Sequence, residues 1–200
     1  MGKNKALFLD RDGVINVDLG YVHRREAFHF QPGIFELCRA AQAQGYLLVV
    51  VTNQAGVARG YYSEADFHDL TEWMLGEFSS RQIRIERVYF CPYHPIHGKG
   101  AYKRDSPDRK PKPGMLRRAA RELGIDLSKS MIIGDSDSDV AAGIAAGIPT
   151  RVLLGPERVG PHKLRVNCQT FPSLDEVRKR FFPSVDPGVR STSLVGVANS

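Results

Sequence analysis

The sequence contains few cysteines and no long hydrophobic run. Its 200 residues include 3 cysteines (Cys38, Cys91 and Cys168), too few and too scattered for a framework of disulfide bonds. No run of about 18 apolar residues is present, so we expect no transmembrane helix. The N-terminal residues also lack the apolar segment of a secretory signal. These absences predict a cytoplasmic protein without a membrane partner.

The overall composition is that of an ordinary folded domain. Hydrophobic residues make up 42% of the chain and charged residues 25%, which excludes wholesale disorder. A chain of this length fits one domain. We expect residues 1–183 to form that domain. Residues 184–200 are small, polar and unpatterned, so we expect a loosely ordered C-terminal tail there.

Positive charge is concentrated in one segment. The whole chain carries a net charge of +6, whereas residues 98–121 contain nine basic and two acidic residues and so carry +7. Such a field attracts anions, including phosphates, sugar phosphates and nucleic acid. A solvated loop and helix face explains the same charge equally well.

Short apolar runs alternate with amphipathic segments along the chain. The expected strands are Lys5–Asp10, Tyr46–Asn53, Arg87–Cys91, Met131–Asp135 and Thr150–Leu154. The expected helices are Ile34–Gln44, Ser63–Ser79, Gly114–Leu123, Asp139–Ala146 and Ser173–Phe182. This alternation predicts an α/β fold with a doubly wound, mostly parallel sheet. Ligands bind beyond the carboxyl ends of the strands in such sheets.

Polar residues follow several of the expected strands. Asp10-Arg11-Asp12-Gly13 closes the first strand, and residues i and i+2 of an extended chain project to the same side, so two carboxylates would lie together there. Their repulsion would be relieved by a cation, and hard oxygen ligands near phosphate favour Mg²⁺. A turn or a helix cap is the structural alternative for such a pair of acids.

Three further segments carry chemistry of the same kind. Thr52-Asn53-Gln54 offers a hydroxyl and amides to phosphate oxygens, or is an ordinary loop entry. Arg109-Lys110-Pro111-Lys112-Pro113-Gly114 presents a compact positive charge on a proline-stiffened loop, or is solvated surface. The segment 134–139, Gly-Asp-Ser-Asp-Ser-Asp, supplies further metal ligands or a helix cap.

In their order and placement these four segments resemble the motifs of the haloacid dehalogenase superfamily of phosphohydrolases. The resemblance covers about residues 5–155 and implies a Rossmann-like core. It implies that Asp10 is the nucleophile and that Asp12 is the general acid and then the base. It also implies that Thr52 and Lys110 steady the phosphoryl group, and that Asp10, the Asp12 carbonyl oxygen and Asp135 hold Mg²⁺.

A finer resemblance is to the D-glycero-D-manno-heptose 1,7-bisphosphate phosphatases and their histidinol-phosphate phosphatase relatives. The segments FLDRDGVINVDLGYV, VVVTNQAGVARG, YFCPYHP and RKPKPGM carry it. It implies that the segment from Asp18 to Tyr21, the loop at Thr52 and Arg109 contact the substrate. The substrate-binding candidates are Asp18, Gly20, Tyr21, Asn53, Gln54, Arg59, Arg109 and Ser136.

Two features set expectations for the surroundings of the site. About 20 residues separate Asp12 from the first helix, and the roughly 57 between Thr52 and Lys110 are used by a helix, a strand and a loop, so no separate cap domain fits. Relatives carry a Cys-x-His and Cys-x-Cys zinc loop. Here Cys91 remains, but Tyr93, Ser106 and Asp108 stand at the other three positions, so we predict no zinc. Prolines and packing alone would then hold the loop.

These observations favour a Mg²⁺-dependent phosphatase of a small phosphorylated sugar, with heptose bisphosphate as the leading substrate. One alternative keeps the chemistry and changes the substrate to histidinol phosphate or a polynucleotide 3′-phosphate. The absence of a basic stripe interleaved with aromatic residues argues against nucleic acid. Another alternative is a non-enzymatic phospho-acceptor or binding module, which could dispense with Asp12. We expect a monomer.

Overall fold

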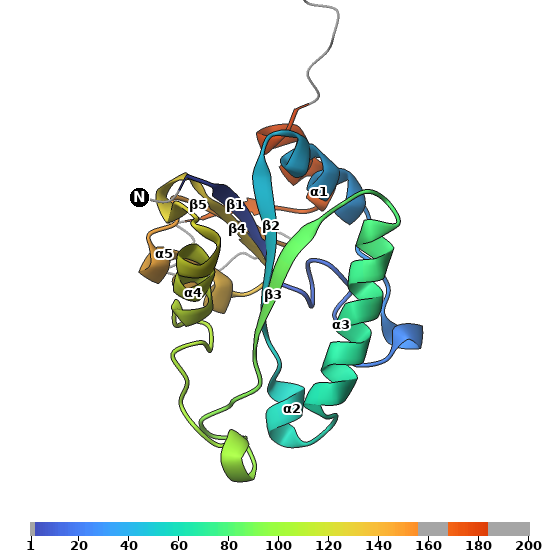
Figure 1. Cartoon of the computed structure of the whole chain (residues 1–200), viewed down its shortest axis with the longest axis vertical. Helices are drawn as coiled ribbons and strands as arrows, with labels where there is room; N and C mark the ends of the chain where they lie inside the picture. The colour runs from blue at the N-terminus through green and yellow to red at the C-terminus, as the bar shows by residue number, and fades with distance from the viewer. Residues whose placement is uncertain (1–2, 156–167, 184–200) are drawn as a thin grey trace, which may run out of the picture.

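A parallel sheet of six strands forms the centre of the described structure (Figure 1). The computed structural model describes residues 3–155 and 168–183. The strand order is β3-β2-β1-β4-β5-β6. The strands are β1 (Lys5–Leu9), β2 (Tyr46–Asn53), β3 (Ile85–Cys91), β4 (Met131–Gly134), β5 (Thr150–Leu154) and β6 (Gln169–Phe171). The predicted doubly wound parallel sheet is confirmed, with the short β6 as an unpredicted edge strand.

Helices connect the strands and follow the predicted segments closely. The α-helices are α1 (Ile34–Ala43), α2 (Ala55–Arg59), α3 (Glu64–Ser79), α4 (Gly114–Leu123), α5 (Asp137–Ala146) and α6 (Leu174–Phe181). Single 3₁₀ turns lie at Arg25–Ala27, Gly100–Tyr102 and Leu127–Lys129. The one-turn helix α2 was not predicted. The expected tail, residues 184–200, lies outside the described residues.

Helix α3 is the longest of the described helices, with 16 residues. Across residues 3–155 and 168–183 no helix is both long and apolar enough to cross a membrane.

Alternate residues of the strands build two separate hydrophobic layers. Leu7 and Leu9 of β1 face α1, α3 and α6, whereas Ala6 and Phe8 face α4 and α5. Figure 1 shows these two groups of helices on opposite sides of the sheet. Because both faces are covered, the strands read as continuous apolar runs rather than as alternating ones. Because helices cover both faces of the sheet, a ligand site is expected at the edge of the sheet, beyond the carboxyl ends of the strands.

The polar strand ends meet at that edge. β1, β2 and β4 lie side by side, with Leu9 paired with Val50 on one side and with Ile133 on the other. The chain after β2 leads to α2 at the lower end of the molecule in Figure 1. Segments far apart in the sequence thus meet in one place, as the strand pattern predicted.

Candidate active site

The Lys110 ammonium group is buried at the carboxyl edge of the sheet, with the whole residue only 3% exposed. Its Nζ lies 2.9 Å from Asp10 Oδ2 and 2.6 Å from Asp139 Oδ1. It also donates to the Val51 carbonyl oxygen at 2.9 Å. An ammonium has three hydrogens, so these three acceptors satisfy it. The two carboxylates hold the pKa of Lys110 above its usual value despite burial, and the group therefore stays charged.

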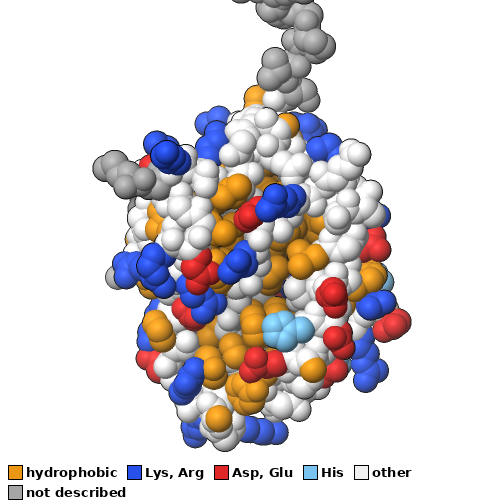
Figure 2. All heavy atoms as spheres, in the orientation of Figure 1, with side chains coloured by type: hydrophobic (Ala, Val, Ile, Leu, Met, Phe, Trp, Pro, Cys, Tyr) orange, Lys and Arg blue, Asp and Glu red, His pale blue; other side chains and the backbone are white. Residues whose placement is uncertain are grey.

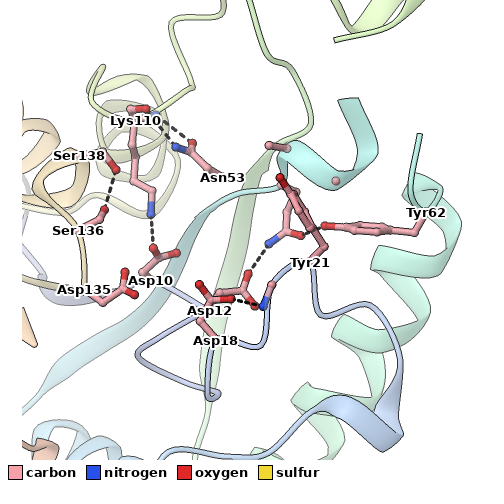
Figure 3. A pocket seen from close by; sticks show the side chains of 14 residues that line it. Asp10, Asp12, Asp18, Tyr21, Asn53, Tyr62, Lys110, Asp135, Ser136 and Ser138 are labelled. Carbon is pink, nitrogen blue, oxygen red and sulfur yellow. Dashed lines mark hydrogen bonds and ion pairs between the residues drawn. The ribbon is translucent and has the colours of Figure 1, made fainter. Parts of the chain in front are cut away.

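Asn53 holds the loop of Lys110 against the end of β2. Its Nδ2 donates to the Lys110 carbonyl oxygen at 3.1 Å, and its Oδ1 accepts from the Lys110 amide at 3.0 Å (Figure 3). These two bonds join the segment Thr52-Asn53-Gln54 to the segment that begins at Arg109. The side-chain amide of Asn53 is therefore already occupied by contacts within the protein.

Three carboxylates gather beside Lys110. One oxygen from each of Asp10, Asp135 and Asp139 lies within 4.8 Å of the others. Burial raises the pKa of the Asp10 carboxyl to about 7 even though Lys110 lowers it. Burial, reinforced by the Asp139 charge, raises the pKa of Asp135 to about 6. Like charges at this spacing are unfavourable unless a cation accompanies them.

Gly13 makes the room for Asp135. Its φ is +82°, and a Cβ atom at this position would lie 2.0 Å from Asp135 Oδ2. An all-oxygen donor set of this size suits a hard divalent cation such as Mg²⁺. The cluster as built therefore fits the cation that the resemblance implies.

Asp12 lies in a different environment from Asp10. Its carboxylate accepts a hydrogen bond from Arg11 Nη2 at 2.9 Å on each oxygen, and one from Asn16 Nδ2 at 3.1 Å. Gln54 Nε2 donates to its Oδ2 at 3.1 Å. Strand β1 ends at Leu9, so the extended-chain argument did not apply to Asp12. The structure gathers Asp135 and Asp139, rather than Asp12, into the acidic cluster with Asp10.

Thr52 and Gln54 form a buried pair beneath the cavity, each 1% exposed. Gln54 Nε2 donates to Thr52 Oγ1 at 2.8 Å. The same amide nitrogen donates to Asp12, so Gln54 links the loop after β2 to the loop after β1. As with Asn53, its polar atoms are engaged within the protein.

The cavity above these groups has a volume of about 410 Å³ and is open to solvent (Figure 3). Asp10, Asp12, Lys110 and Asp135 line its floor. The other lining residues are Asp18, Gly20, Tyr21, Asn53, Gln54, Ala55, Gly56, Tyr62, Ser136 and Ser138. Most of the residues predicted from the sequence are thus brought together around one cavity.

Two lining segments have notable local structure. Tyr21 has a φ of 54°, a left-handed conformation that is strained for a bulky residue. It follows Gly20, whose amide donates to Asp18 Oδ1 at 2.8 Å. Ser136 is the N-cap of α5, and its hydroxyl donates to Asp139 Oδ2 at 2.6 Å. The helix cap that the sequence offered as an alternative role for segment 134–139 is therefore present at Ser136.

Arg59 and Arg109 lie outside the residues that line the cavity. The Arg59 guanidinium lies 5.9 Å from the centre of the Tyr21 ring, and Arg109 Nη1 donates to the Tyr93 carbonyl oxygen at 3.2 Å. Burial and the nearby Arg59 charge lower the pKa of Arg109. The positive charges of Arg59 and Arg109 are therefore close enough to repel each other, and a bound anion would reduce that repulsion.

The loop between β3 and α4 brings together three of the four positions that were compared with a zinc loop, namely 91, 106 and 108. Cys91 is buried, and its thiol lies 3.9 Å from the Tyr93 carbonyl oxygen. The charge of Asp108 and a hydrogen bond from Ser106 both act on the Cys91 thiol, so these side chains still face one another. Within residues 3–155 and 168–183, no set of three or more His, Cys, Asp or Glu ligands surrounds Cys91.

Side-chain bonds from two helices also hold this loop. Asp108 Oδ2 pairs with Arg118 Nη1 of α4 at 2.8 Å, and the Tyr102 hydroxyl donates to Glu64 Oε1 of α3 at 2.9 Å. The expectation that prolines and packing alone hold the loop was therefore wrong. It considered only residues inside the loop, whereas the partners come from distant segments.

Sequence reasoning missed five residues of the site, namely Asp139 and the lining residues Ala55, Gly56, Tyr62 and Ser138. Asp139 was visible only as part of the segment 134–139, and its pairing with Lys110 depends on α5 starting at Asp137, two residues earlier than predicted. Tyr62, which lines the cavity, carried no signal beyond standing between Gly60 and the helix cap at Ser63.

The site brings together a buried aspartate–lysine pair, an acidic cluster and an open cavity at the edge of a parallel sheet. A family model described as "HAD-hyrolase-like" matches residues 108–164. The fold and the site are thus those of a HAD-like hydrolase.

Known proteins narrow this class. The chain is 56% identical over 152 residues to the D-glycero-alpha-D-manno-heptose-1,7-bisphosphate 7-phosphatase of Burkholderia mallei, covering 76% of this chain and 80% of the relative. It is 50% identical over 149 residues to the D-glycero-beta-D-manno-heptose-1,7-bisphosphate 7-phosphatase of Vibrio cholerae, and the match covers 74% of this chain and 80% of that relative. A crystal structure of D,D-heptose 1.7-bisphosphate phosphatase from B. bronchiseptica, complexed with magnesium and phosphate, superposes with a TM-score of 0.77 at 27% identity, covering 88% and 97%. The chain belongs to this family of heptose bisphosphate phosphatases and is a phosphatase.

We predict that Gly13→Ala weakens Mg²⁺ binding at least about tenfold, because the new methyl group would occupy the space of Asp135 Oδ2. Calorimetric titration with Mg²⁺ measures this. Gly45→Ala is the matched control, since Gly45 also has a positive φ (+79°) but nothing lies within 4 Å of the added Cβ. Equal Mg²⁺ affinity in the two variants would contradict the assignment of the cluster.

We also predict that Asp135→Asn stabilises the metal-free protein at high pH. The folded-state pKa of Asp135 is raised from 3.8 to about 6, so ionisation opposes folding. This cost is absent below about pH 4, grows up to about pH 6 and then stays constant. The variant should therefore be more stable by about 1 kcal/mol at pH 8 and equal to the parent near pH 4. Denaturant unfolding in a chelator measures this, and a less stable variant at pH 8 would refute it.

Proposed function

We propose that the protein hydrolyses the 7-phosphate of D-glycero-D-manno-heptose 1,7-bisphosphate in the presence of Mg²⁺, through an aspartyl-phosphate at Asp10. The observation that carries this proposal is the Asp10–Lys110 pair, 2.9 Å apart on the floor of an open cavity. The names of the relatives supply the substrate. Those names divide between the alpha and the beta anomer, so both anomers are tested below.

The first step transfers the phosphoryl group to the protein. An Asp10 carboxylate oxygen attacks phosphorus, the bond from phosphorus to the sugar oxygen breaks, and the proton of Asp12 goes to that oxygen. In the second step a water oxygen attacks phosphorus, its proton goes to the Asp12 carboxylate, and the bond to Asp10 breaks. Inorganic phosphate leaves, and both acids return to their starting states.

The remaining groups on the cavity floor have electrostatic roles in this proposal. Lys110, fixed by Asp10, Asp139 and the Val51 carbonyl, offsets the negative charge of an incoming phosphoryl group. Asp10, Asp135 and the Asp12 carbonyl oxygen would hold Mg²⁺, and Asp139 belongs to the same acidic cluster. Bound Mg²⁺ would reduce the repulsion between an anionic nucleophile and an anionic substrate. Thr52 would donate its hydroxyl hydrogen to a phosphoryl oxygen.

The rim residues would recognise the rest of the substrate. Asp18, Gly20 and Tyr21 border the cavity on one side and Ser136 on the other. Arg59 and Arg109 are adjacent cations just beyond the lining, and a second phosphate would relieve their repulsion. An open cavity with a pair of guanidinium groups beyond its lining suits a small bisphosphate.

A nucleic-acid substrate is less well supported. Figure 2 shows Lys and Arg side chains scattered among acidic and apolar ones on the face it presents, without a continuous basic stripe. Extended binding of a polynucleotide backbone needs such a stripe.

We further propose that the loop after β3 needs no zinc. The Asp108–Arg118 ion pair and the bond from Tyr102 to Glu64 link the loop to α4 and α3, where a bound zinc would otherwise fix it. One carboxylate oxygen of Asp108 is paired with Arg118, which makes Asp108 a poorer metal ligand.

A panel of substrates tests the proposed activity. We predict the highest kcat/KM for one anomer of heptose 1,7-bisphosphate, ahead of histidinol phosphate and a 3′-phosphorylated oligonucleotide, and loss of phosphate release from every substrate in Asp10→Asn. Released phosphate is the measurement, with circular dichroism confirming that the variant is folded. Wild-type turnover by Asp10→Asn would refute the nucleophile, and preference for another substrate would refute the heptose assignment.

For the loop, we predict no stoichiometric zinc in protein purified without chelators, and no change in melting temperature on adding a zinc chelator. Elemental analysis and thermal unfolding measure the two outcomes. One zinc per chain would contradict the proposal.

Arg118→Ala should increase proteolytic cleavage within residues 92–109, because it removes a partly buried partner of Asp108.

A further inference from the structure

Tyr62 makes a buried contact below the cavity that the proposed mechanism does not use. It lies between α2 and α3 and is 8% exposed. Its hydroxyl donates to Gln54 Oε1 at 2.5 Å, and Figure 3 shows the ring reaching across from the side of α3 toward Asp12. Tyr62 touches neither Asp10 nor Lys110 through any hydrogen bond of the described structure.

The chemistry of the amide makes this contact directional. Gln54 Nε2 has two hydrogens, and its two acceptors are Asp12 Oδ2 at 3.1 Å and Thr52 Oγ1 at 2.8 Å. An ionised Asp12 carboxylate can only accept, so the NH₂ end of the amide faces Asp12 in the resting site. The carbonyl end then faces Tyr62, and the phenol donates to it. When Asp12 carries the proton that the proposed reaction needs, the hydrogen bond from Tyr62 still holds the amide in this orientation.

We propose that Tyr62 is a positioning residue for phosphoryl transfer, which acts by holding Gln54 so that the Asp12 carboxyl and the Thr52 hydroxyl keep their orientations. The inference rests on the proposed function in one respect, the role of Asp12 as proton donor to the leaving oxygen. It assigns to Gln54 a role in aligning Asp12 rather than in touching the substrate.

The same arrangement orients Thr52. Its Oγ1 accepts from Gln54, so its own hydrogen is left to donate elsewhere. The nearest use for that hydrogen in the proposed reaction is a phosphoryl oxygen. If the amide turned over, its carbonyl would instead accept the Thr52 hydrogen and remove it from the reaction.

The ring of Tyr62 is held in place on both sides. A Cβ at Gly56 would lie 2.1 Å from the ring, so only glycine permits this approach. The His23 ring stacks on Tyr62 with centroids 4.9 Å apart and an interplanar angle of 7°. Burial raises the pKa of Tyr62 to about 12, so the phenol keeps the proton that it donates.

Arg11 limits the size of the effect. Its guanidinium also binds the Asp12 carboxylate and donates to the Val22 carbonyl oxygen at 2.7 Å. Asp12 thus keeps its contacts with Arg11 when Tyr62 loses its hydroxyl, although Arg11 then loses its own hydrogen bond to the Tyr62 oxygen. We therefore expect partial misalignment of the proton donor, and not the complete loss of activity that removing Asp12 itself would cause.

Two aryl phosphates isolate this effect. Phenyl phosphate needs a proton on its leaving oxygen, whereas p-nitrophenolate leaves without one. We expect Tyr62→Phe to lower kcat/KM for phenyl phosphate about tenfold, as for loss of one aligning hydrogen bond, and for p-nitrophenyl phosphate less than about threefold. A merely structural role would lower both values equally, and that result, or no change in either, would overturn the proposal.

Tyr61→Phe is the matched control. Tyr61 is 55% exposed, its ring lies 4.8 Å from that of Tyr21, and it has no hydrogen bond to Gln54 in the described structure, so both kcat/KM values should stay at the wild-type level. Gly56→Ala is the second variant, because the added Cβ would displace the Tyr62 ring and its hydroxyl from Gln54 while residue 62 remains a tyrosine. It should reproduce the selective loss for phenyl phosphate even if Tyr62→Phe folds poorly, and an equal loss for both substrates would again overturn the proposal.

The experiment separates this inference from the substrate assignment. Neither aryl phosphate contains a sugar, so the comparison does not depend on heptose recognition. A wild-type protein that hydrolyses aryl phosphates but not heptose bisphosphate would refute the proposed substrate while leaving the role of Tyr62 open to the same measurement.

Discussion

A buried ammonium group between two carboxylates is the interaction on which the site depends. Lys110 reaches the edge of the sheet from a loop that pairs with no strand, and Asp10, Asp139 and the Val51 carbonyl take up its three hydrogens. A charge buried to this extent is tolerated only with such partners. Because the partners come from β1, β2 and α5, one side chain ties together the motifs that must act in concert.

The same interaction explains why so much negative charge is stable at this edge. Asp10, Asp135 and Asp139 would repel one another strongly, and Lys110 compensates only part of that repulsion, as the raised pKa values of Asp10 and Asp135 indicate. The uncompensated part is free energy that the fold gives up and that a bound cation would recover. The arrangement is therefore better explained by ligand binding than by stability.

The strands and helices were largely predictable because both signals are local. Continuous apolar runs and helix caps, such as Ser63 with Asp66, lie within a few residues of the elements they define. The order of the polar segments along the chain also predicted that Asp10, Thr52, Lys110 and Asp135 meet at the carboxyl ends of the strands. The contacts that refine the site were not predictable, because they join distant segments. Asn53 binds the Lys110 backbone, Arg118 binds Asp108, and Tyr62 binds Gln54.

Asp10 and Asp12 illustrate how two like residues acquire different properties from their surroundings. They are two positions apart, but β1 ends at Leu9, and the turn stabilised by Gly13 sends their side chains in different directions. Asp10 enters the buried cluster with Lys110, whereas Asp12 is held by Arg11 and Gln54 at the side of the cavity. In the proposed mechanism one carboxyl group attacks and the other exchanges a proton, and these two environments suit that division of roles.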